Sequence, residues 1–113
     1  MRGYEYKTLK HNGDATISYD IIGKFPVKFA DFSKQILENE NSFRVEFGAA
    51  NECYGGWLGN RLEVRKSKDE DEWYITKEKP ENWLEEIVNK NVTKCWANGG
   101  WGQMLYICTF EEE

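Results

Sequence analysis

The sequence predicts an α+β domain in which a mainly antiparallel sheet of about six or seven strands carries two amphipathic helices. Three observations support this class: a hairpin signal near the N-terminus, two segments with apolar residues at helical spacing, and several short segments of alternating polarity. The chain has 113 residues, a size that suits one domain with one core. We therefore expect residues 1–113 to form a single domain.

The first two strands are predicted to form a hairpin. Residues 3–9 and 15–21 flank an Asn12-Gly13 pair, which favours a tight turn because both residues tolerate positive φ. Apolar and polar side chains alternate over residues 15–21. This strand should therefore have one buried face and one exposed face.

Residues 27–39 are predicted to form the first helix. Phe29, Phe32 and Ile36 recur at helical spacing, and charged residues occupy the opposite side. Apolar and charged residues then alternate over residues 43–47, which predicts the third strand.

The rest of the chain is predicted to contain more strands and a second helix. A glycine-rich segment at 49–59 is expected to form a loop or an irregular hairpin tip. The second helix begins at a proline and carries glutamates early and a lysine late, as the helix dipole favours. The predicted elements are strands at residues 61–65 and 73–77, a helix at 80–90, and a last hairpin with strands at 92–97 and 103–110.

The two halves of the chain share an order of signals: strand, amphipathic helix, Asn-x-Asn, strand, Gly-Gly-Trp and strand. Asn39-Glu40-Asn41, for example, parallels Asn89-Lys90-Asn91. One interpretation is an internal duplication. The other is that a strand, helix and hairpin follow one another in many unrelated α+β folds.

The charge and hydropathy of the chain exclude several classes of partner. A formal net charge of −5 argues against direct binding to a phosphate backbone or to an anionic membrane surface. No segment approaches the roughly 20 apolar residues of a membrane span, and the N-terminus lacks the apolar run of a signal peptide. We therefore expect a soluble, cytoplasmic protein.

The cysteines and the histidine give no sign of a metal or redox site. Cys53, Cys95 and Cys108 lack the close spacing of zinc ligands or of a redox dithiol. We expect reduced thiols, no metal, no cofactor and no structural disulfide, although Cys53 and Cys95 could pair if the fold brought them together. His11, the only histidine, lies in a predicted exposed turn, which does not favour a catalytic role.

Two glycine-rich segments each contain a tryptophan, Trp57 and Trp101. Glycine allows sharp turns and close approach, and tryptophan supplies a flat contact surface, so both segments are candidate binding loops. In the alternative interpretation, each ring covers an edge of the core. Neither segment matches a phosphate-binding loop. The residues expected to contact a ligand or partner are Tyr54, Trp57, Asn60, Trp96, Asn98 and Trp101.

Acidic residues supply two further candidate sites. One run lacks the spacing of a calcium loop and is predicted to be a solvated turn that can face a basic partner. It comprises Asp69, Glu70, Asp71 and Glu72. Glu46, Glu52 and Glu63 could act as general acid and base near the first glycine-rich segment, or they could be ordinary surface carboxylates.

These observations favour a non-enzymatic protein that acts as an inhibitor by occupying the surface of a partner protein. Acidic residues would steer the encounter with a basic, nucleic-acid-binding partner, and exposed aromatic rings would supply affinity. In size, acidity and aromatic content the chain resembles small accessory proteins of phages and mobile elements, which assigns no residue roles. A second hypothesis is a protein that binds or sequesters a nucleotide or metabolite through its Gly-Gly-Trp loops. A third is a carboxylate-dependent enzyme.

Overall fold

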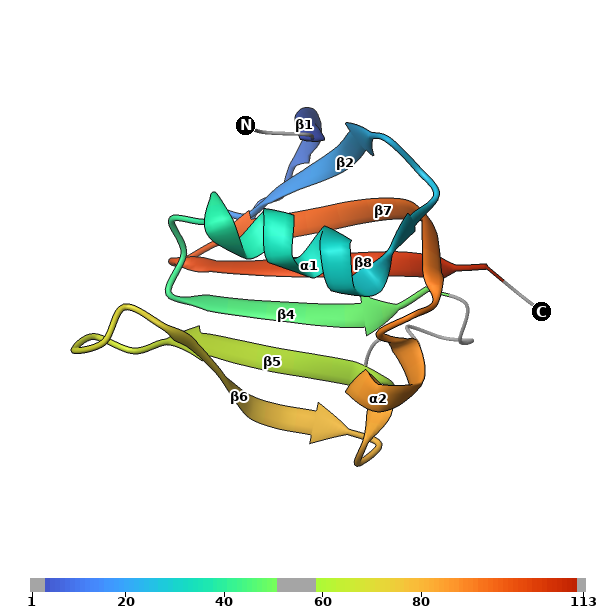
Figure 1. The fold of residues 1–113 in the computed structure, drawn as a ribbon. Helices are drawn as coiled ribbons and strands as arrows, with labels where there is room; N and C mark the ends of the chain where they lie inside the picture. The colour runs from blue at the N-terminus through green and yellow to red at the C-terminus, as the bar shows by residue number, and fades with distance from the viewer. Residues whose placement is uncertain (1–3, 51–58, 112–113) are drawn as a thin grey trace.

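The computed structural model describes residues 4–50 and 59–111. Within these residues the chain forms one mixed sheet of eight strands and two short helices (Figure 1). The strands are β1 (Tyr4–His11), β2 (Ile17–Gly23), β3 (Val27–Lys28), β4 (Arg44–Ala49), β5 (Arg61–Lys66), β6 (Trp73–Lys79), β7 (Asn91–Gly100) and β8 (Gln103–Phe110). The helices are α1 (Phe29–Glu38) and α2 (Trp83–Ile87).

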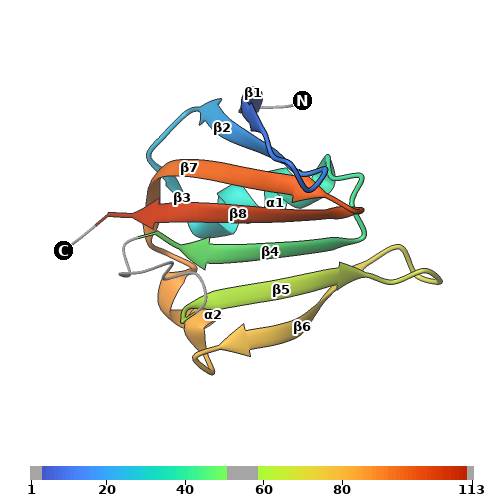
Figure 2. The ribbon, with the colours of Figure 1, turned by 180° about the vertical axis from the view of Figure 1, so that it is seen from behind.

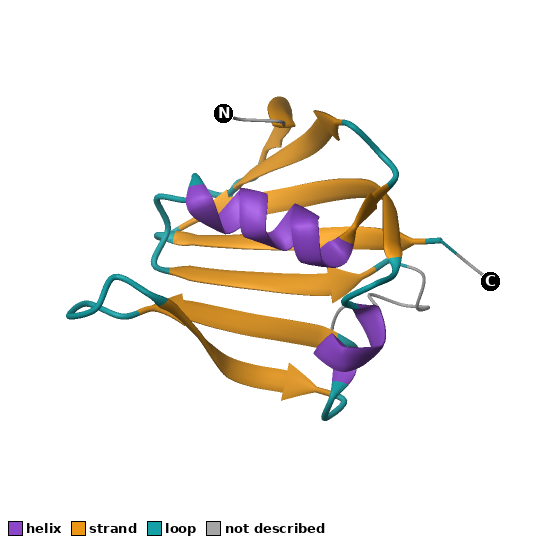
Figure 3. Cartoon of the chain, viewed as in Figure 1, coloured by secondary structure: helices purple, strands orange, loops and turns teal. Residues whose placement is uncertain are grey.

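The predicted α+β class is wrong, because the chain is mostly β and its helices have only ten and five residues (Figure 3). The second helix was predicted at residues 80–90. It begins late because Asn82 adopts a left-handed backbone with φ of 69°, and the Trp83 N–H donates to the Pro80 carbonyl in a turn. Neither helix of the described residues is long and apolar enough to cross a membrane.

The strand order is β1-β2-β7-β8-β4-β5-β6, and the short strand β3 also pairs with β7 (Figure 2). All neighbouring strands of the described sheet are antiparallel except β4 and β8, which are parallel. The pairing of β4 with β8 joins residues about sixty positions apart, such as Arg44 and Gln103. This pair holds the two halves of the sheet together.

The sheet does not support an internal duplication. The hairpins β4–β5 and β7–β8 would correspond, but β4 is parallel to β8 and therefore runs opposite to β7. Superposing β4–β5 on β7–β8 would require a half-turn about an axis in the plane of the sheet, perpendicular to the strands. Such a rotation exchanges the two faces of the sheet, so the helices that precede the two hairpins would lie on opposite faces. Both helices instead pack against Phe110 on one face, α1 through Phe29 and α2 through Trp83.

The core lies between α1 and the sheet. Helix α1 crosses one face of β7, β8 and β4 (Figure 1) and buries Phe29 and Phe32. The ring of Phe29 meets Phe47 edge-on at 5.3 Å, and Phe32 lies edge-on to Tyr106 at 6.4 Å. Because strand side chains alternate between faces, the neighbours of Phe47 and Tyr106 along their strands point to the other side of the sheet. We call this helix-free side the open face (Figure 2).

Candidate functional site

The open face of β4 and β5 carries a row of charged side chains. Val45 and Phe47 point into the core, so Arg44 and Glu46 project from the other side of β4. The register places Arg44 opposite Arg65 and Glu46 opposite Glu63 on β5. Charged residues from two strands therefore meet in the middle of the sheet.

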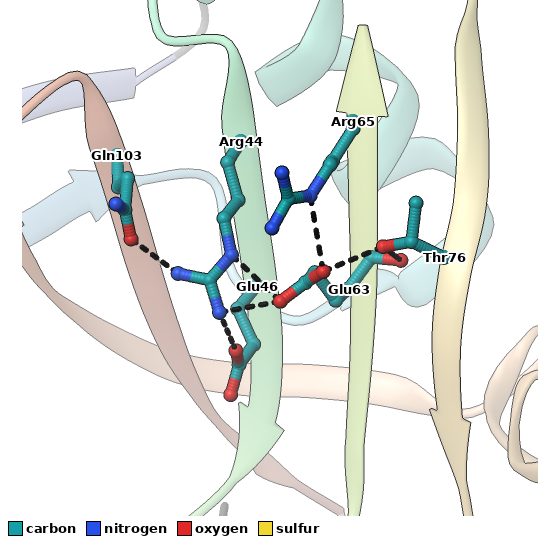
Figure 4. A network of polar contacts seen from close by, with 6 residues as sticks. All are labelled: Arg44, Glu46, Glu63, Arg65, Thr76 and Gln103. Atoms are coloured by element: carbon teal, nitrogen blue, oxygen red, sulfur yellow. Dashed lines mark hydrogen bonds and ion pairs between the residues drawn. The ribbon is translucent and has the colours of Figure 1, made fainter.

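Glu63 lies at the centre of this row and is only 1% exposed. Its Oε1 accepts a hydrogen bond from Arg44 Nε at 2.6 Å, and its Oε2 accepts one from Thr76 Oγ1 at 2.6 Å (Figure 4). Arg65 Nε donates to the same Oε2 at 3.3 Å. Burial alone raises the pKa of Glu63, but the hydrogen bonds from Thr76, Arg44 and Arg65 and the Arg44 charge outweigh it and lower the pKa to about 2.

A sheet irregularity brings Thr76 to this carboxylate. The register between β5 and β6 shifts between Glu63 and Val64, so Thr76 has no direct partner in the ladder. Its hydroxyl turns to Glu63 instead and contacts both the carboxylate and, at 3.2 Å, the backbone carbonyl. The bulge therefore supplies a donor that a regular ladder would place elsewhere.

Arg44 links three strands through one guanidinium group. Its Nη1 donates to Gln103 Oε1 on β8, and its Nη2 donates to Glu46 Oε1 at 3.0 Å and pairs with Glu63 on β5 (Figure 4). Each nitrogen of the guanidinium therefore has an acceptor. This network fixes the side chains of Glu46 and Gln103 on the open face.

Glu46 is also buried but has fewer partners than Glu63. Its residue is 4% exposed, and burial raises its pKa despite the opposing charges of Arg44 and Arg61, with a further rise from Glu63. Only Oε1 is hydrogen-bonded, because Oε2 has no partner among the described residues.

A pocket of about 300 Å³ lies beside Glu46 on the open face. Three buried side-chain polar atoms of the described residues have no hydrogen-bond partner: Glu46 Oε2, Arg61 Nε and Asn98 Oδ1. All three belong to residues that line this pocket. Leaving such an atom unpaired costs about 1–3 kcal/mol, so their gathering in one place calls for an explanation.

Trp101 forms part of the wall of the same pocket. It lies in the turn between β7 and β8, is 72% exposed, and has a left-handed backbone with φ of 60°. The flanking Gly102 allows Phe43 to approach, because a Cβ there would lie 2.7 Å from the Phe43 ring. The predicted exposure of Trp101 is thus confirmed, and its ring does not cover the core.

The structure brings two of the predicted contact residues together. Asn98 and Trp101 line one pocket, although Asn98 lies in β7 and not in a loop as predicted. Trp96 also projects from the open face of β7, because Cys95 and Ala97 on either side of it are buried in the core. It does not line the pocket.

Asn60 does not join this group. It lies just before β5, at the end of the sheet opposite Trp101, because β5 begins where β4 ends. Tyr54 and Trp57 fall outside the described residues, as does Glu52.

The acidic run Asp69–Glu72 forms the turn between β5 and β6. It does not present a purely acidic surface, because Asp71 pairs with Lys66 at 3.1 Å. A groove of about 610 Å³ adjoins the turn and combines aromatic, basic and acidic side chains. Its lining includes Phe43, Tyr74, Arg65, Lys68, Glu70 and Glu72.

Sequence reasoning missed Arg44, Arg61 and Gln103 as site residues. The signal was present in the arginines and glutamates that alternate with apolar residues in the strands at 43–47 and 61–65. The glutamates were interpreted as a possible general acid and base or as ordinary surface carboxylates, and the arginines were given no role, because one sequence does not reveal that β4 and β5 pair and bury these charges together.

Two cysteines face each other inside the core. Cys95 on β7 lies opposite Cys108 on β8, and both are buried free thiols. Cys53 lies outside the described residues. Within residues 4–50 and 59–111, no cluster of three His, Cys, Asp or Glu side chains could hold a metal ion.

The fold and the site define a mostly β protein with a polar pocket on the open face of a single mixed sheet. No protein-family model, curated protein or solved structure matches the chain.

Proposed function

We propose that the protein binds a small polar ligand in the pocket beside Glu46. The observation that supports this most directly is that three buried polar atoms without partners, Glu46 Oε2, Arg61 Nε and Asn98 Oδ1, belong to residues that line one pocket. Buried polar atoms in folded proteins are nearly always hydrogen-bonded. A ligand towards which these three side chains turned would supply the missing hydrogen bonds and offset the cost of leaving the atoms unpaired.

The size and the walls of the pocket also suit a small ligand. A volume of about 300 Å³ is at the lower end of the range for small-molecule sites. Trp101 offers a flat, exposed ring at the rim, and the Arg44 network holds the side chains of Glu46 and Gln103 in fixed positions before a ligand arrives. Such preorganisation reduces the entropy lost on binding.

This proposal retains one hypothesis drawn from the sequence and relocates it. A ligand-binding or sequestering protein was expected to use both Gly-Gly-Trp segments. Among the described residues, the pocket draws on the second segment through Gly99, Gly100 and Trp101, and on the charged row of β4 and β5. Trp57 of the first segment lies outside the described residues.

Ligand-observed NMR with a metabolite library, run on the wild type and on Glu46→Gln, tests the proposal. We expect at least one compound to bind the wild type and to lose most of its affinity in Glu46→Gln. Glu70→Gln is the matched control, since it changes an exposed carboxylate outside the pocket. A screen in which every compound binds both proteins equally, or none binds, would contradict the proposal.

A second candidate function is binding to a partner protein, the function that the sequence favoured. The observation in its favour is the groove beside the acidic turn, where Phe43 and Tyr74 are 50% and 51% exposed and Glu70 and Glu72 lie nearby. These rings would supply contact area, and the carboxylates would steer a basic, nucleic-acid-binding protein. A phage-type inhibitor of such a host protein would act through this surface.

Capture of a basic protein from lysate by the wild type, but not by a Phe43→Ala, Tyr74→Ala double variant, would support this second function. Capture should weaken as salt rises, because exposed charges are screened. Equal capture by both proteins would count against it.

A further inference from the structure

We infer that a second pocket, between β1 and the C-terminal end of α1, binds a lysine or arginine side chain of a partner protein. No residue lines both this pocket and the one beside Glu46, so the inference goes beyond the proposed function. It follows from a chain of hydrogen bonds that ends on Glu40, from the charge of the pocket lining and from the exposed ring of Tyr6.

The second pocket has a volume of about 220 Å³ and lies where β1 meets the last turn of α1. Tyr4 and Tyr6 are two residues apart on β1, so their side chains share one face of the strand. This face is turned towards α1, because the Tyr4 ring lies edge-on to Phe32 at 5.3 Å. On the helix, Asn39 Nδ2 donates to the Gln35 carbonyl one turn earlier, and both residues line the pocket.

A chain of three side chains fixes the direction of the hydrogen bonds at this pocket. The Tyr106 hydroxyl donates to Glu40 Oε2 at 2.9 Å. A phenol carries only one proton, so Tyr6 must be the donor in the 2.7 Å hydrogen bond between the Tyr6 and Tyr106 hydroxyls. The Tyr6 oxygen can then only accept a further hydrogen bond, as an ionised carboxylate does. Both Tyr6 and Glu40 therefore favour a ligand that carries donors.

The two ends of this chain are accessible, although its middle is not. Tyr106 is fully buried, whereas Tyr6 is 37% exposed and Glu40 is partly exposed. Tyr6 and Glu40 both line the pocket. Because their side-chain oxygens contact the same buried hydroxyl, the two side chains lie close together. They are near enough for one small group to contact both.

The pocket has an uncompensated negative charge. Glu40 is the only charged residue of its described lining, and none of the ion pairs among the described residues includes it. Burial raises the pKa of Glu40, although hydrogen bonds from Tyr106 and Ser42 oppose the rise. The last turn of α1 carries no basic residue to balance the negative end of the helix dipole. A bound cation would supply the missing positive charge at both places.

A basic side chain matches these properties. Ammonium and guanidinium groups combine a positive charge with N–H donors, and either can lie against the Tyr6 ring in a cation–π contact. The pocket is smaller than the roughly 300–1,000 Å³ of most small-molecule sites, so it suits one side chain better than a whole metabolite. Asn39 and Asn41 are exposed in its lining and can pair with the backbone of a partner. The net charge of −5 attracts a basic protein.

NMR titration of the isotope-labelled protein with four small probes tests the need for charge and donors. At constant ionic strength, n-propylguanidinium and n-butylammonium should each bind about fivefold more tightly than n-butanol, which has no charge, or tetramethylammonium, which has no N–H donor. The amide signals of Tyr6, Ile36 and Glu40 should shift. The inference is overturned if butanol or tetramethylammonium binds as tightly as the other two cations, if neither of those cations binds, or if only signals outside the pocket shift.

Variants test the assigned contacts. Glu40→Gln retains an acceptor for Tyr106 but loses the charge, so it should weaken propylguanidinium about fivefold. Tyr6→Leu should weaken it about threefold through loss of the ring. Because Tyr6 is at the edge of the sheet, this variant serves if Glu40→Gln does not fold. Glu38→Gln is the matched control, since Glu38 is an exposed carboxylate at the same end of α1 that does not line the pocket. An equal effect of Glu38→Gln would indicate general attraction of cations and contradict the assigned site.

Peptides identify the source of the cation. An acetylated and amidated pentapeptide with lysine or arginine between glycines should bind more tightly than butylammonium or propylguanidinium, because its backbone can contact the exposed amides. The same peptide with a central glutamine should bind at least about fivefold more weakly than the basic ones. Tighter binding of the free cations than of the basic peptides would identify a small amine as the ligand and overturn the assignment to a partner protein. Glu46→Gln should leave this binding unchanged, so a failure here is distinct from a failure of the proposed function.

Discussion

Glu46 and Glu63 lie directly opposite each other on β4 and β5, yet their pKa values shift in opposite directions. Both carboxyls are buried, which raises both pKa values. Glu63 overcomes this through donors from Thr76, Arg44 and Arg65, whereas Glu46 has one. Glu63 is therefore firmly ionised and organises the sheet. Glu46 has fewer hydrogen bonds and lines the pocket.

Replacing Glu63 should destabilise the protein strongly. Glu63→Gln leaves Arg44 and Arg65 without their shared anion. Breaking a buried ion pair in this way should lower the free energy of unfolding by about 3 kcal/mol. This value is at the low end of the usual range because Arg65 is partly exposed. Urea denaturation measures this. Thr76→Val, which removes one hydroxyl donor, should cost only about 1 kcal/mol. A loss below that of Thr76→Val would show that the network contributes little.

Acid should weaken the fold through Glu63. Its folded pKa of about 2 lies below the ordinary value of 4.5, so its stabilisation is complete above pH 4.5 and disappears as the pH falls towards 2. The free energy of unfolding, measured from pH 6 down to about pH 2 to span this window, should fall steeply for the wild type and less steeply for Glu63→Gln. Identical slopes for the two proteins would argue against this origin.

Glu46 should have the opposite effect on the pH dependence. Because its folded pKa is raised, its ionisation opposes folding as the pH rises above the ordinary value of 4.5. The ionisation of Glu46 should therefore lower the stability of the wild type as the pH rises from acidic to neutral. Glu46→Gln should lack this contribution. The same denaturation series checks this, and a Glu46→Gln protein that is less stable than the wild type only at neutral pH would contradict it.

Trp101 should be dispensable for folding. Its left-handed backbone disfavours any residue with a Cβ, so Trp101→Gly should leave the unfolding free energy unchanged or raise it by about 1 kcal/mol. Trp83 is the matched control, since it is buried against Phe110, and Trp83→Ala should cost about 3–5 kcal/mol. Denaturant melts of both variants compare them. A loss above about 2 kcal/mol for Trp101→Gly would mean that the ring packs like a core residue.

The facing thiols should be protected in the folded protein. Cys95 and Cys108 are fully buried, and burial raises the pKa of Cys95, which disfavours the reactive thiolate. In a Cys53→Ser variant, iodoacetamide should label neither thiol under native conditions and both in denaturant, as intact mass spectrometry would show. Rapid labelling of the native variant would indicate that β7 and β8 open readily.

Local periodicity predicted most of the strands. Alternation at residues 43–47 and 61–65 located β4 and β5 to within about two residues, because each strand has one core face and one polar face. The second helix was overestimated because its sequence signals did not reveal the left-handed backbone at Asn82. The parallel pairing of β4 with β8 joins distant segments, and nothing local in either segment encodes it.

The glycines of the second glycine-rich segment were only partly understood. Gly99 was assigned to a loop but lies within β7, where an added Cβ would meet the end of the Met104 side chain. This glycine therefore belongs to a strand and not to the turn. The same error hid the position of Asn98, whose side chain reaches the pocket because β7 continues through it.

The central position of β8 has a consequence for biosynthesis. In the described sheet, the block β4-β5-β6 meets the block that contains β7 only through β8, the last strand to be made. Until residues 103–110 leave the ribosome, the edge of β4 that β8 will cover has no partner. A nascent chain that lacks β8 thus exposes a pairing edge to neighbouring chains, and this hazard ends when residues 103–110 emerge and pair with β4.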